Sequence, residues 1–479
     1  MAGRGLLPAE AELIRIHQMA LRVLEQIGMR VEHAKMRECL AGKGCTIDGE
    51  RVFFPRELVE ETISEIPDSF SLYGRSTETR VEIGLDETIC TNTGIFPNIV
   101  DFESSAIRRT TLDDVAATTR VLDALESMHA VYVSLVDATE VASHLVTLTD
   151  LAAVLANTTK PLVGPGLTNR AEAQAVVAMC QAVRGGDGEH LRRYPLCVPF
   201  VCAVSPLYMP TDIVEALIIV AEAGLPLDAL TNPVMGMSAP YTVASTVALG
   251  QAEVLALAVM AHTITPGLPI LCQNTPSVAD MWSMASTTGG PETGLIRQVG
   301  TQLAQHLGIP ACAHGHTSSA RLDPQAADEK ALNTLLIASS RPAILGGAGA
   351  LANVTLTSYE TLLMDDERNQ AVLRILAGVD TDDDHLAYDV IADLARTGVV
   401  MSHEHTLRYL HSTETWQPEL AVRSGLVGGM VPPESLVDRA RTKARELLQT
   451  HRVEPLPAAV EAEIAHIVQR YDREVGAFG

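Results

Sequence analysis

The stretch PACAHGHTSSARLDPQAADEKALNTLLIASSRPAILGGAGAL, residues 310–351, holds the pattern that decides the fold. A short apolar run stands at each end of it, and each run opens on a proline. A proline at such a point ends the preceding helix and needs no donor in a sheet. The segment between the two runs has the apolar spacing of a helix. The stretch therefore predicts one strand, one helix and a second strand in parallel.

The same β-then-α unit recurs along the chain. We predict strands at residues 87–92, 129–136, 161–165, 196–204, 225–230, 269–274, 310–315 and 342–349. Helices are predicted at residues 112–127, 141–157, 171–183, 211–223, 242–263, 292–307, 325–339 and 358–376. Eight such units favour an α/β protein of the (β/α)8 TIM barrel class. An open, doubly wound sheet has the same rhythm and is the alternative, because only spatial closure separates the two.

Two flanking segments complete the predicted organisation. Residues 1–86 are expected to form an N-terminal helical cap, with helices near 8–28, 34–42 and 55–66 and a short strand pair near 45–54. Residues 87–378 are the barrel. Residues 379–479 are expected to form a helical extension packed on the barrel, with helices near 381–396, 402–411, 433–449 and 457–476.

Composition narrows the class of protein. The chain has 479 residues, 47% of them hydrophobic, and a formal net charge of -24. Such an acidic chain repels phosphates, which argues against a nucleic-acid partner. The eight cysteines form no C-x-x-C pair, and the N-terminus lacks the apolar core of a signal peptide. With no uninterrupted apolar stretch of about 18 residues, we expect a cytoplasmic protein without a membrane span.

In a barrel of this class, the active site lies in the loops that follow the strands. Those positions carry amides, hydroxyls and histidines here, with neither a lone lysine nor a pair of carboxylates. Such a set orients a ligand by hydrogen bonds rather than moving protons. The polar and apolar candidates at the strand ends are Asn92, Thr93, Asn232, Met235, Gln273, Asn274, His314 and His316. Aromatic candidates for holding a cationic ligand are Phe96, Tyr208 and Trp282.

The histidine pairs HGH (314–316) and HEH (403–405) raise the alternative of a metal site. Zinc requires three or four ligands, and the end of the first strand, TNTG at 91–94, has no histidine. His403 and His405 fall in a helical stretch, where residues two apart do not share a face. We therefore expect no bound metal, and we interpret His314 and His316 as hydrogen-bonding residues. A barrel metal hydrolase that uses these two histidines stays open as the alternative.

Six blocks of sequence occur in a familiar order. They are LPAEAELIRIHQMALRVLEQIGMRVEH (7–33), FFPRELVEETISEIPDSFSLYGR (53–75), GMSAPYTVASTVALGQAEVLALAV (236–259), DPQAADEKALNTLLIASSRPAILGGAGAL (323–351), SYETLLMDDE (358–367) and HEHTLRYLHSTETWQPEL (403–420). In these blocks the chain resembles the trimethylamine:corrinoid methyltransferase superfamily. The resemblance implies a (β/α)8 barrel, which agrees with the count of units. It also implies methyl transfer from a methylated amine to cobalt.

The resemblance further implies that the corrinoid cofactor is carried by a separate partner protein. Founding members contain pyrrolysine, whereas this chain has only the twenty common residues, so it is similar to the non-pyrrolysine branch. Relatives in that branch act on quaternary amines such as glycine betaine, proline betaine or carnitine. A homo-oligomer is also expected. A non-catalytic binder of methylated amines is a further alternative.

Residue roles follow from the same resemblance. His314 and His316 are expected to bond the carboxylate of a betaine, with Arg321 as its charge partner. Gly346, Gly347 and Gly349, after the eighth strand, are expected to face the cofactor, although a tight turn also explains them. The chain departs from the family pattern at Tyr241 and Ser245 in GMSAPYTVAS and at Trp282 in DMWSM (280–284). Both departures leave the substrate open.

Overall fold

The computed structural model describes residues 7–133, 135–423 and 434–476. Ser134, within the predicted second strand, and Pro433, at the start of a predicted helix, lie outside the described residues. All eight predicted barrel strands are present. They are β6 (Ile89–Asn92), β9 (Val131–Tyr132), β10 (Leu162–Gly166), β11 (Cys197–Ala203), β13 (Leu227–Thr231), β15 (Ile270–Asn274), β18 (Cys312–His314) and β19 (Ile344–Ala348).

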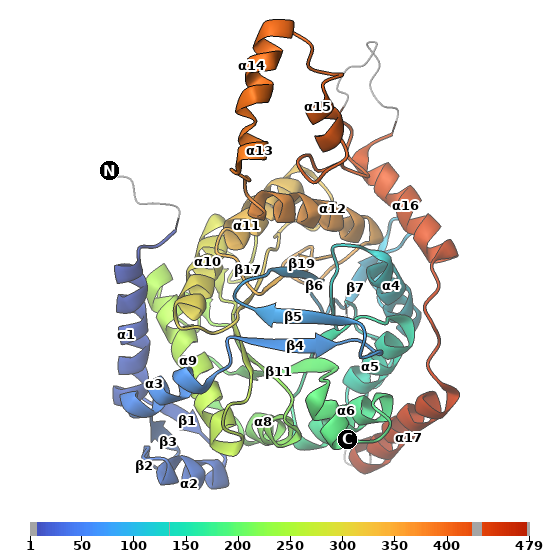
Figure 1. Ribbon diagram of the computed structural model, residues 1–479. Helices are drawn as coiled ribbons and strands as arrows, with labels where there is room; N and C mark the ends of the chain where they lie inside the picture. The colour runs from blue at the N-terminus through green and yellow to red at the C-terminus, as the bar shows by residue number, and fades with distance from the viewer. Residues whose placement is uncertain (1–6, 134, 424–433, 477–479) are drawn as a thin grey trace.

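A helix follows each strand and lies on the outside of the barrel (Figure 1). These helices are α4 (Leu112–Ala124), α5 (Val146–Asn157), α6 (Arg170–Val183), α8 (Thr211–Ala223), α9 (Val243–Ile264), α10 (Pro291–His306), α11 (Pro324–Ala338) and α12 (Tyr359–Leu376). The strands read as continuous apolar runs because they are covered on both faces, by the barrel interior and by this helical ring.

Hydrogen bonds between the strands close the sheet into a barrel. Neighbouring strands pair in parallel in the orders β9-β10-β11-β13-β15 and β18-β19-β6. Parallel bridges join the two groups at both junctions, from Cys90 to Met128 and from Cys272 to Ala311. At the first junction the backbone N–H of His129 donates to the Cys90 carbonyl, at 3.0 Å. The barrel is therefore confirmed, and the open-sheet alternative is wrong, because an open sheet would leave these edges unpaired.

The N-terminal segment packs against one side of the barrel (Figure 1). It comprises α1 (Glu10–Gln26), β1 (Met29–Val31), α2 (Ala34–Gly42), β2 (Thr46–Asp48), β3 (Arg51–Phe53) and α3 (Arg56–Glu65). Gly28 follows α1 with a φ of +69°, and a side chain there would lie 2.3 Å from the Val52 carbonyl oxygen. The turn from α1 into β1 therefore requires a glycine. Helices α1, α2 and α3 all contact α9.

The predicted cap before residue 87 includes the strand pair β2–β3 but misses a second hairpin. Strands β4 (Ser69–Tyr73) and β5 (Arg80–Gly84) pair antiparallel and lie across the end of the barrel where its strands begin (Figure 1). Phe70, Leu72 and Ile83 share a buried cluster with the first residues of the barrel strands. The hairpin thus covers the barrel floor. Its residues alternate in burial, the pattern of a strand with one buried face.

Shorter helices and strands lie in the loops that connect the barrel strands and helices. They are β7 (Asn98–Val100), β8 (Ile107–Arg109), α7 (Gly188–Arg193), β12 (Tyr208–Met209), β14 (Val234–Met235), β16 (Ser277–Ala279) and β17 (Ser286–Thr287). Strand β12 pairs with β1, so one strand-end loop of the barrel is built into the N-terminal segment. Strands β14, β16 and β17 form a small sheet beyond β13 and β15.

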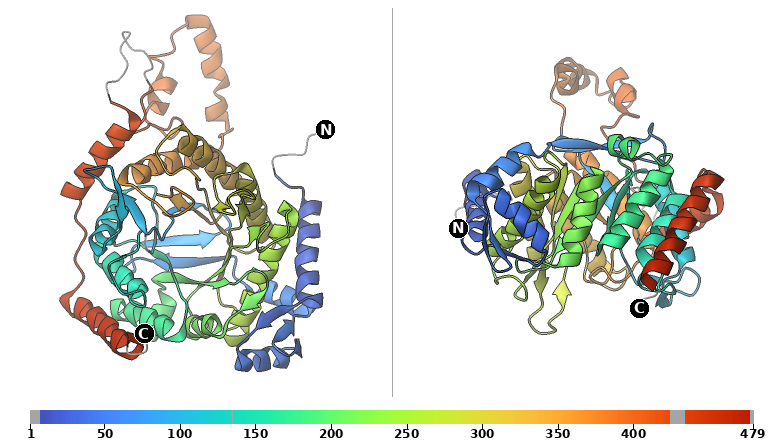
Figure 2. Two further views of the ribbon diagram at one scale, coloured as in Figure 1. Left: turned by 180° about the vertical axis from the view of Figure 1, so that it is seen from behind. Right: turned by 90° about the horizontal axis from the view of Figure 1, so that it is seen from below.

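The C-terminal segment has two parts that behave differently. Helices α16 (Leu436–Thr450) and α17 (Ala458–Val475) pack on the barrel, α16 against α4 and α12, and α17 against α5 and α6. Helices α13 (Asp383–Leu386), α14 (Tyr388–Thr397) and α15 (Glu404–Tyr409) project away from it (Figures 1 and 2). We call residues 379–411 the arm. The expectation that the whole extension packs on the barrel is therefore wrong for the arm.

Helix α9 is long and apolar enough to cross a membrane, but it is a core helix. In its most apolar 18-residue window, 83% of the residues are buried inside the protein. It contacts α1, α3, α8 and α10 as well as strands β13 and β15. A helix that is apolar all round is one that its own fold surrounds. The principal core cluster runs from α1 through the barrel to α17, so it joins all three predicted segments. The division into three domains stays a prediction.

Candidate functional site at the barrel mouth

The candidate site lies on the inward face of the barrel, near the carboxyl ends of the strands. Alternate residues of a strand point to opposite faces. Tyr132 of β9 and Phe200 of β11 pack with the inward apolar side chains, and their rings lie 6.1 Å apart. Gln273 of β15 and His314 of β18 join them, and the His314 ring stands edge-on to Tyr132 at 5.8 Å. The aromatic rings of Tyr132 and Phe200 form one half of the candidate site, and the imidazole of His314 belongs to the other half.

His314 is held in place by its neighbours on both sides. Its Nε2 lies 3.1 Å from the amide nitrogen of Gln273 and 3.3 Å from the Cys312 sulfur. Gly346, across from it on β19, leaves room for the ring, because a side chain there would lie 2.3 Å from Nδ1 of His314. Gln273 donates to Nε2, so the proton of the neutral ring is on Nδ1. That N–H is buried, lies against Gly346 and has no hydrogen-bond partner.

A buried arginine, which the sequence did not single out, lies beside the second histidine. Arg297 of α10 is 3% exposed, and its Nη1 donates to the His314 carbonyl at 2.6 Å and to Nδ1 of His316 at 3.1 Å. Its Nε donates to the Pro276 carbonyl at 3.2 Å. A guanidinium can only donate, so Nδ1 of His316 accepts and Nε2 carries the proton. The Nε2 of His316 is also buried without a partner.

Burial and charge keep both imidazoles neutral. Burial, helped by the Arg297 charge, lowers the pKa of His314 to about 3. The same causes, in the same order, hold the pKa of His316 well below its usual value. Burial also lowers the pKa of Arg297 to about 10, which still leaves it charged at neutral pH. The mouth therefore offers two uncharged N–H donors beside one fixed cation, a combination that suits an oxygen with negative charge.

Beneath the histidines lies a buried acid. Asp228 of β13 is fully buried, and both of its carboxyl oxygens lack hydrogen-bond partners. Burial raises its pKa well above the usual value, which favours the neutral carboxyl. The Tyr132 phenol, whose pKa burial also raises, lies near it. The floor of the site therefore adds no negative charge.

Two further buried charges hold the loops around the mouth. Glu253 of α9 accepts hydrogen bonds from the Leu207 N–H at 2.8 Å, from the Ser205 hydroxyl at 2.7 Å and from Thr231. It thereby ties together the ends of β11 and β13. On the far side, Asp365 of α12 pairs with Lys330 of α11 and accepts from the Gly349 N–H at 2.9 Å. Burial lowers the pKa of Lys330 to about 8.

Of the predicted site residues, the structure brings together Gln273, His314 and His316. Two of the predicted amide side chains instead form hydrogen bonds that hold the barrel together. Asn92 donates to the Tyr132 carbonyl at 3.0 Å and accepts from the Tyr132 N–H at 2.8 Å, which fastens β6 to β9. Asn274 points outward between α9 and α10, where it donates to the Val247 carbonyl at 3.2 Å. Thr93 is buried, and its N–H donates to the Ala348 carbonyl at 3.1 Å.

Three of the predicted aromatic and apolar contacts pack elsewhere. Tyr208 pairs with Arg30 across β12 and β1, where the Arg30 guanidinium lies 4.8 Å from its ring centre. Phe96 is fully buried in the main core. Met235 packs in a separate apolar cluster with Leu13 and Ile296. These positions follow barrel strands in the sequence, but the loops turn their side chains away from the mouth, so they are corrections to the predicted site.

Three other predicted residues are exposed to solvent. Trp282 is 97% exposed at the turn between β16 and β17, and Asn232 is also exposed. Arg321 is exposed in the loop before α11, where its backbone N–H donates to Ser319. Arg297 occupies the position beside the histidines that was expected for Arg321. Its signal in the sequence is a lone basic residue on a helix face that is otherwise small or apolar, TGLIRQVGTQLA.

The three predicted cofactor-facing glycines make room for neighbouring elements. A side chain at 346 would collide with His314, one at 347 with the Gly315 backbone and one at 349 with Leu135. Gly347 and Gly349 also have φ values of +117° and +89°. Close packing of β18 and β19 thus accounts for these glycines, and their contact with a cofactor stays a prediction.

The rim of the mouth is apolar. Seven large side chains in the loops after β6, β11, β13 and β15 are 46–97% exposed: Ile95, Val204, Met237, Tyr241, Met281, Trp282 and Met284. Monomeric proteins rarely expose such a group of apolar residues together, and it is typical of a protein-binding surface. Tyr241 and Trp282, two of the residues that depart from the family pattern, belong to this rim.

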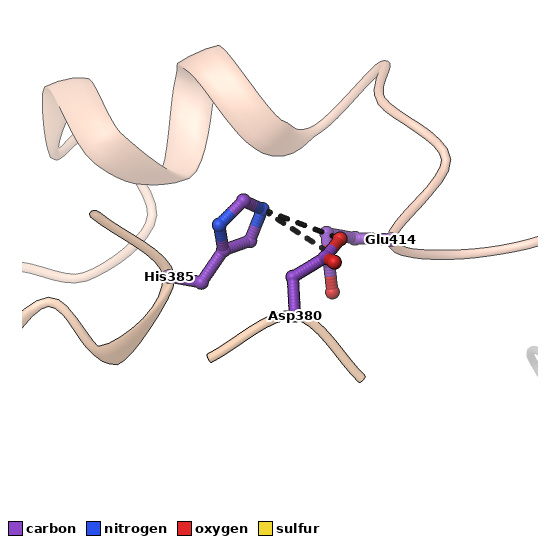
Figure 3. A group of neighbouring side chains, drawn as sticks. All are labelled: Asp380, His385 and Glu414. Carbon is purple, nitrogen blue, oxygen red and sulfur yellow. Dashed lines mark ion pairs between the residues drawn. The ribbon is translucent and has the colours of Figure 1, made fainter. Parts of the chain in front are cut away.

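Among the described residues, one group of side chains has the spacing of metal ligands, and it lies away from the mouth: Asp380 and His385 belong to the arm, and Glu414 follows it (Figure 3). Nε2 of His385 lies 3.6 Å from Glu414 and 3.9 Å from Asp380, and Nδ1 lies 2.6 Å from Asp382. The hydrogen bond to Asp382, and then the carboxylate charges, raise the pKa of His385. A protonated imidazole among exposed carboxylates explains this group without a metal. At the mouth, the Arg297 charge beside His316 opposes a metal on that ring.

Residues 6–476 match the model of the family described as trimethylamine methyltransferase (MTTB). The chain belongs to this family. The family resemblance seen in the sequence is therefore confirmed. Trimethylamine methyltransferase MttB of Desulfitobacterium hafniense (strain DSM 10664 / DCB-2) is 30% identical over 472 residues, covering 98% of this chain and 94% of that protein. Glycine betaine methyltransferase of Desulfitobacterium hafniense (strain Y51) is 27% identical over 470 residues, covering 98% and 97%.

A solved structure agrees with the fold of this MTTB-family member. The crystal structure of monomethylamine methyltransferase MtmB from Methanosarcina barkeri matches with a TM-score of 0.52 at 13% identity, covering 95% of this chain and 96% of that one. At this identity the similarity concerns the fold alone. It supports the barrel that the backbone bridges close.

Proposed function

We propose that this chain transfers a methyl group from a quaternary amine that carries a carboxylate, such as a betaine, to the cobalt of a corrinoid on a partner protein. One observation carries the choice of substrate class. Two buried N–H groups, on Nδ1 of His314 and Nε2 of His316, stand without partners beside the charged Arg297. Leaving a buried donor unpaired costs about 1–3 kcal/mol, so a substrate oxygen that pairs with both gains binding energy.

The glycine at position 346 supports this assignment. A Cβ there would lie 2.3 Å from Nδ1 of His314, so the glycine lets the ring approach β19 and keeps a side chain away from its free N–H. A carboxylate oxygen is the group that suits two neutral donors and a nearby guanidinium. Trimethylamine has no such oxygen, which is why the geometry favours a betaine.

The aromatic half of the site suits the other end of a betaine. The Tyr132 ring lies 5.8 Å from the His314 ring, and the Phe200 ring lies 6.1 Å from the Tyr132 ring. The face of an aromatic ring attracts a quaternary ammonium, by about 0.5–2 kcal/mol. Tyr132 and Phe200 thus take the part that the sequence had suggested for Phe96, Tyr208 and Trp282.

The mouth fits chemistry that needs orientation and no proton transfer. A corrinoid brought by its carrier would supply a Co(I) nucleophile for the methyl carbon. The C–N bond breaks with its electron pair on nitrogen, and the amine leaves as a neutral tertiary amine that requires no general acid. The residues of this chain therefore have to hold the carboxylate and the ammonium and to exclude water. Neutral histidines and a neutral Asp228 are consistent with that task.

The apolar rim supports a protein partner at the mouth. A corrinoid carrier has to bring its cobalt to the open end of the barrel, because the β4–β5 hairpin covers the other end. The exposed rim from Ile95 to Met284 is the surface it would cover.

All eight cysteines are free, which agrees with a reducing cytoplasm. No observation favours a hydrolase at His314 and His316, since Arg297 already occupies Nδ1 of His316.

The test is to incubate the purified protein with Co(I) cobalamin and glycine betaine, tetramethylammonium or trimethylamine, and to follow the methyl-cobalt absorption spectrum. We expect methylation with the betaine to exceed that with the two compounds that lack a carboxylate. Methylation by trimethylamine alone would contradict the substrate class. Betaine binding with no methyl-cobalt signal, from either free cobalamin or a corrinoid protein, would favour a non-catalytic binder.

A further inference from the structure

The proposed methyl transfer gives no task to Asp228, the buried acid of the site. Both of its carboxyl oxygens are buried and lack a hydrogen-bond partner in the described part of the chain. Burying a polar group without a partner costs free energy, and an apolar side chain of similar size avoids that cost. A buried polar group of this kind therefore requires an explanation. In the wall of a binding site, that explanation is a ligand that pairs with it.

Asp228 faces the interior of the barrel, beside the aromatic half of the site. In the parallel register, Phe200 of β11 stands next to Asp228, and Asp228 stands next to Leu271 of β15. Residues paired in this way share one face of the sheet. Leu271 belongs to the inward apolar cluster, together with Tyr132 and Phe200. Asp228 is therefore a neighbour of the ring that the proposed function assigns to the ammonium.

Side chains in the layer above Asp228 are partly exposed. Cys202 and Leu230 come two residues after Phe200 and Asp228, on the same inward faces, and Phe200, Cys202 and Leu230 are all partly exposed. Two residues of a strand span about 6.6 Å. A small ligand that contacts these three side chains therefore has the Asp228 carboxyl directly beneath it.

We propose that the Asp228 carboxyl gives its proton to the tertiary amine that remains after methyl transfer. The inference rests on the proposed function, in which the histidines hold the substrate carboxylate and the ammonium lies against Tyr132 and Phe200. The methyl group that leaves points to the mouth, because the methyl acceptor comes from there. The lone pair left on nitrogen points to the mouth at first, and inversion of the amine turns it toward the barrel floor and Asp228.

The proton transfer is balanced between the two groups. The O–H bond of the Asp228 carboxyl breaks, its electron pair stays on the oxygen, and the proton forms an N–H bond with the nitrogen lone pair. The product is then a tertiary ammonium paired with a carboxylate. An amine whose lone pair is protonated does not take the methyl group back, so this step favours the forward direction.

The neutral state of Asp228 before the transfer is part of this role. Burial raises the pKa of its carboxyl well above the usual value. A carboxylate beside the substrate would stabilise the positive charge that methyl transfer removes from nitrogen, and would therefore slow the reaction. A neutral carboxyl avoids this effect and still carries the proton that the product amine takes up.

The titratable groups around Asp228 do not replace it as the proton donor. Among the described residues, those that interact with it electrostatically are Tyr132 on β9, Cys202 on β11, Cys272 on β15 and Cys312 on β18. Burial raises the pKa of Cys202 and that of Cys272 to about 12. It also raises the pKa values of Tyr132 and Cys312 well above their usual values. These four groups therefore keep their protons near neutral pH.

The experiment is isothermal titration of the full-length protein near pH 7, in two buffers that differ in ionisation enthalpy. It compares dimethylglycine with glycine betaine, and trimethylamine with tetramethylammonium, so that each tertiary amine has a quaternary counterpart. The tertiary amines carry their own proton in solution, so pairing with Asp228 sends one proton to the buffer. We expect this release with both tertiary amines and none with the quaternary compounds. Binding of the tertiary amines should therefore tighten as the pH rises.

Asp228→Asn should abolish the proton release and leave the affinity for the quaternary compounds unchanged. It should weaken binding of the tertiary amines about 10- to 100-fold, as expected for the loss of a hydrogen bond between charged groups. The matched control is Asp212→Asn, at an exposed position of α8 outside the barrel, and it should bind all four compounds as the wild type does. Glu253 on α9 is intact in both variants, so a release from that carboxyl would persist in Asp228→Asn.

Proton release with the quaternary compounds as well, or release that persists in Asp228→Asn, would overturn the inference. Binding of the tertiary amines to the wild type without release would also overturn it, and this measurement needs no variant. The proposed function fails in a different way. Ligands that bind and release protons as expected, but give no methyl-cobalt signal, would overturn that function while the pairing of Asp228 with the amine stands. If none of the four compounds binds, both are wrong.

Discussion

Nη1 of Arg297 lies 3.1 Å from Nδ1 of His316, and this contact decides which ring nitrogen carries the proton. An arginine has no acceptor, so the histidine presents Nε2–H to the barrel interior. The same guanidinium donates to the carbonyl of His314 at 2.6 Å and so places the second imidazole. One side chain from the outer helix α10 thus sets the tautomer of His316 and also binds the backbone of His314, whose own tautomer is set by Gln273.

Removing the Arg297 charge should weaken carboxylate binding without unfolding the barrel. For Arg297→Met, we expect the KM for glycine betaine to rise about 10- to 100-fold, the equivalent of about 1.5–3 kcal/mol for hydrogen bonds of a charged group. The pKa of His316 should rise as well, because a coulombic cause of its lowering is gone. Steady-state kinetics and nitrogen NMR of the labelled imidazole check the two effects. A raised KM with an unchanged His316 titration would contradict the positioning role.

His316 should discriminate between substrates with and without a carboxylate. We expect His316→Ala to weaken glycine betaine binding by about 1–3 kcal/mol, the cost of leaving the partner oxygen unpaired. Binding of tetramethylammonium, which has no oxygen, should change little. Isothermal titration of both ligands makes the comparison. Arg321→Ala is the matched control, since Arg321 is exposed and its guanidinium should leave both affinities unchanged. Equal losses for both ligands would argue against a carboxylate contact.

A methyl group at position 346 should displace the His314 ring. The Cβ of Gly346→Ala would lie 2.3 Å from Nδ1 of His314, so the ring has to move. Overpacking of this kind costs about 1–3 kcal/mol of stability, and we expect methyl transfer to fall by a larger factor than this loss explains. Thermal unfolding and the methyl-cobalt assay measure the two quantities. Gly42→Ala is the control, because no atom lies within 4 Å of a Cβ there. Full activity in Gly346→Ala would contradict the site.

The barrel could be read from the sequence because each unit repeats the same local signals. An apolar run of strand length marks every unit independently, and prolines also precede β18 and β19, so an error in one unit changes little. The β4–β5 hairpin could not be assigned in the same way. Its residues alternate like any half-buried strand pair, and only the closed barrel provides the floor against which Phe70 and Leu72 pack.

The site was harder to predict than the fold. The choice of residues at the ends of strands identifies His314 and Gln273, but it also includes Asn274. The Asn274 side chain points outward because strand residues alternate between the two faces of the sheet. Arg297 and Glu253 were not predicted because they belong to helices, whereas the candidate residues were those that follow the strands. Both have a signal: each is a charged residue within a buried stretch of helix. Burying a charged group costs free energy, so such a residue indicates either a binding site or a contact that holds loops together.

Asp228 provides a test of the pH dependence. Its pKa in the folded protein is raised by burial, so its contribution to stability is complete below about 3.9, the usual value for an aspartate, and is lost as the pH rises toward the folded value. Asp228→Asn has the same shape and does not titrate. We therefore expect its melting temperature to exceed that of the wild type by a margin that grows from pH 4.5 to pH 8. His316→Gln should act in the opposite sense, since a lowered histidine pKa costs stability as the pH falls below about 6.5. Calorimetry across this range compares the three proteins, and a constant margin for Asp228→Asn would show that the carboxyl is already ionised in the folded state.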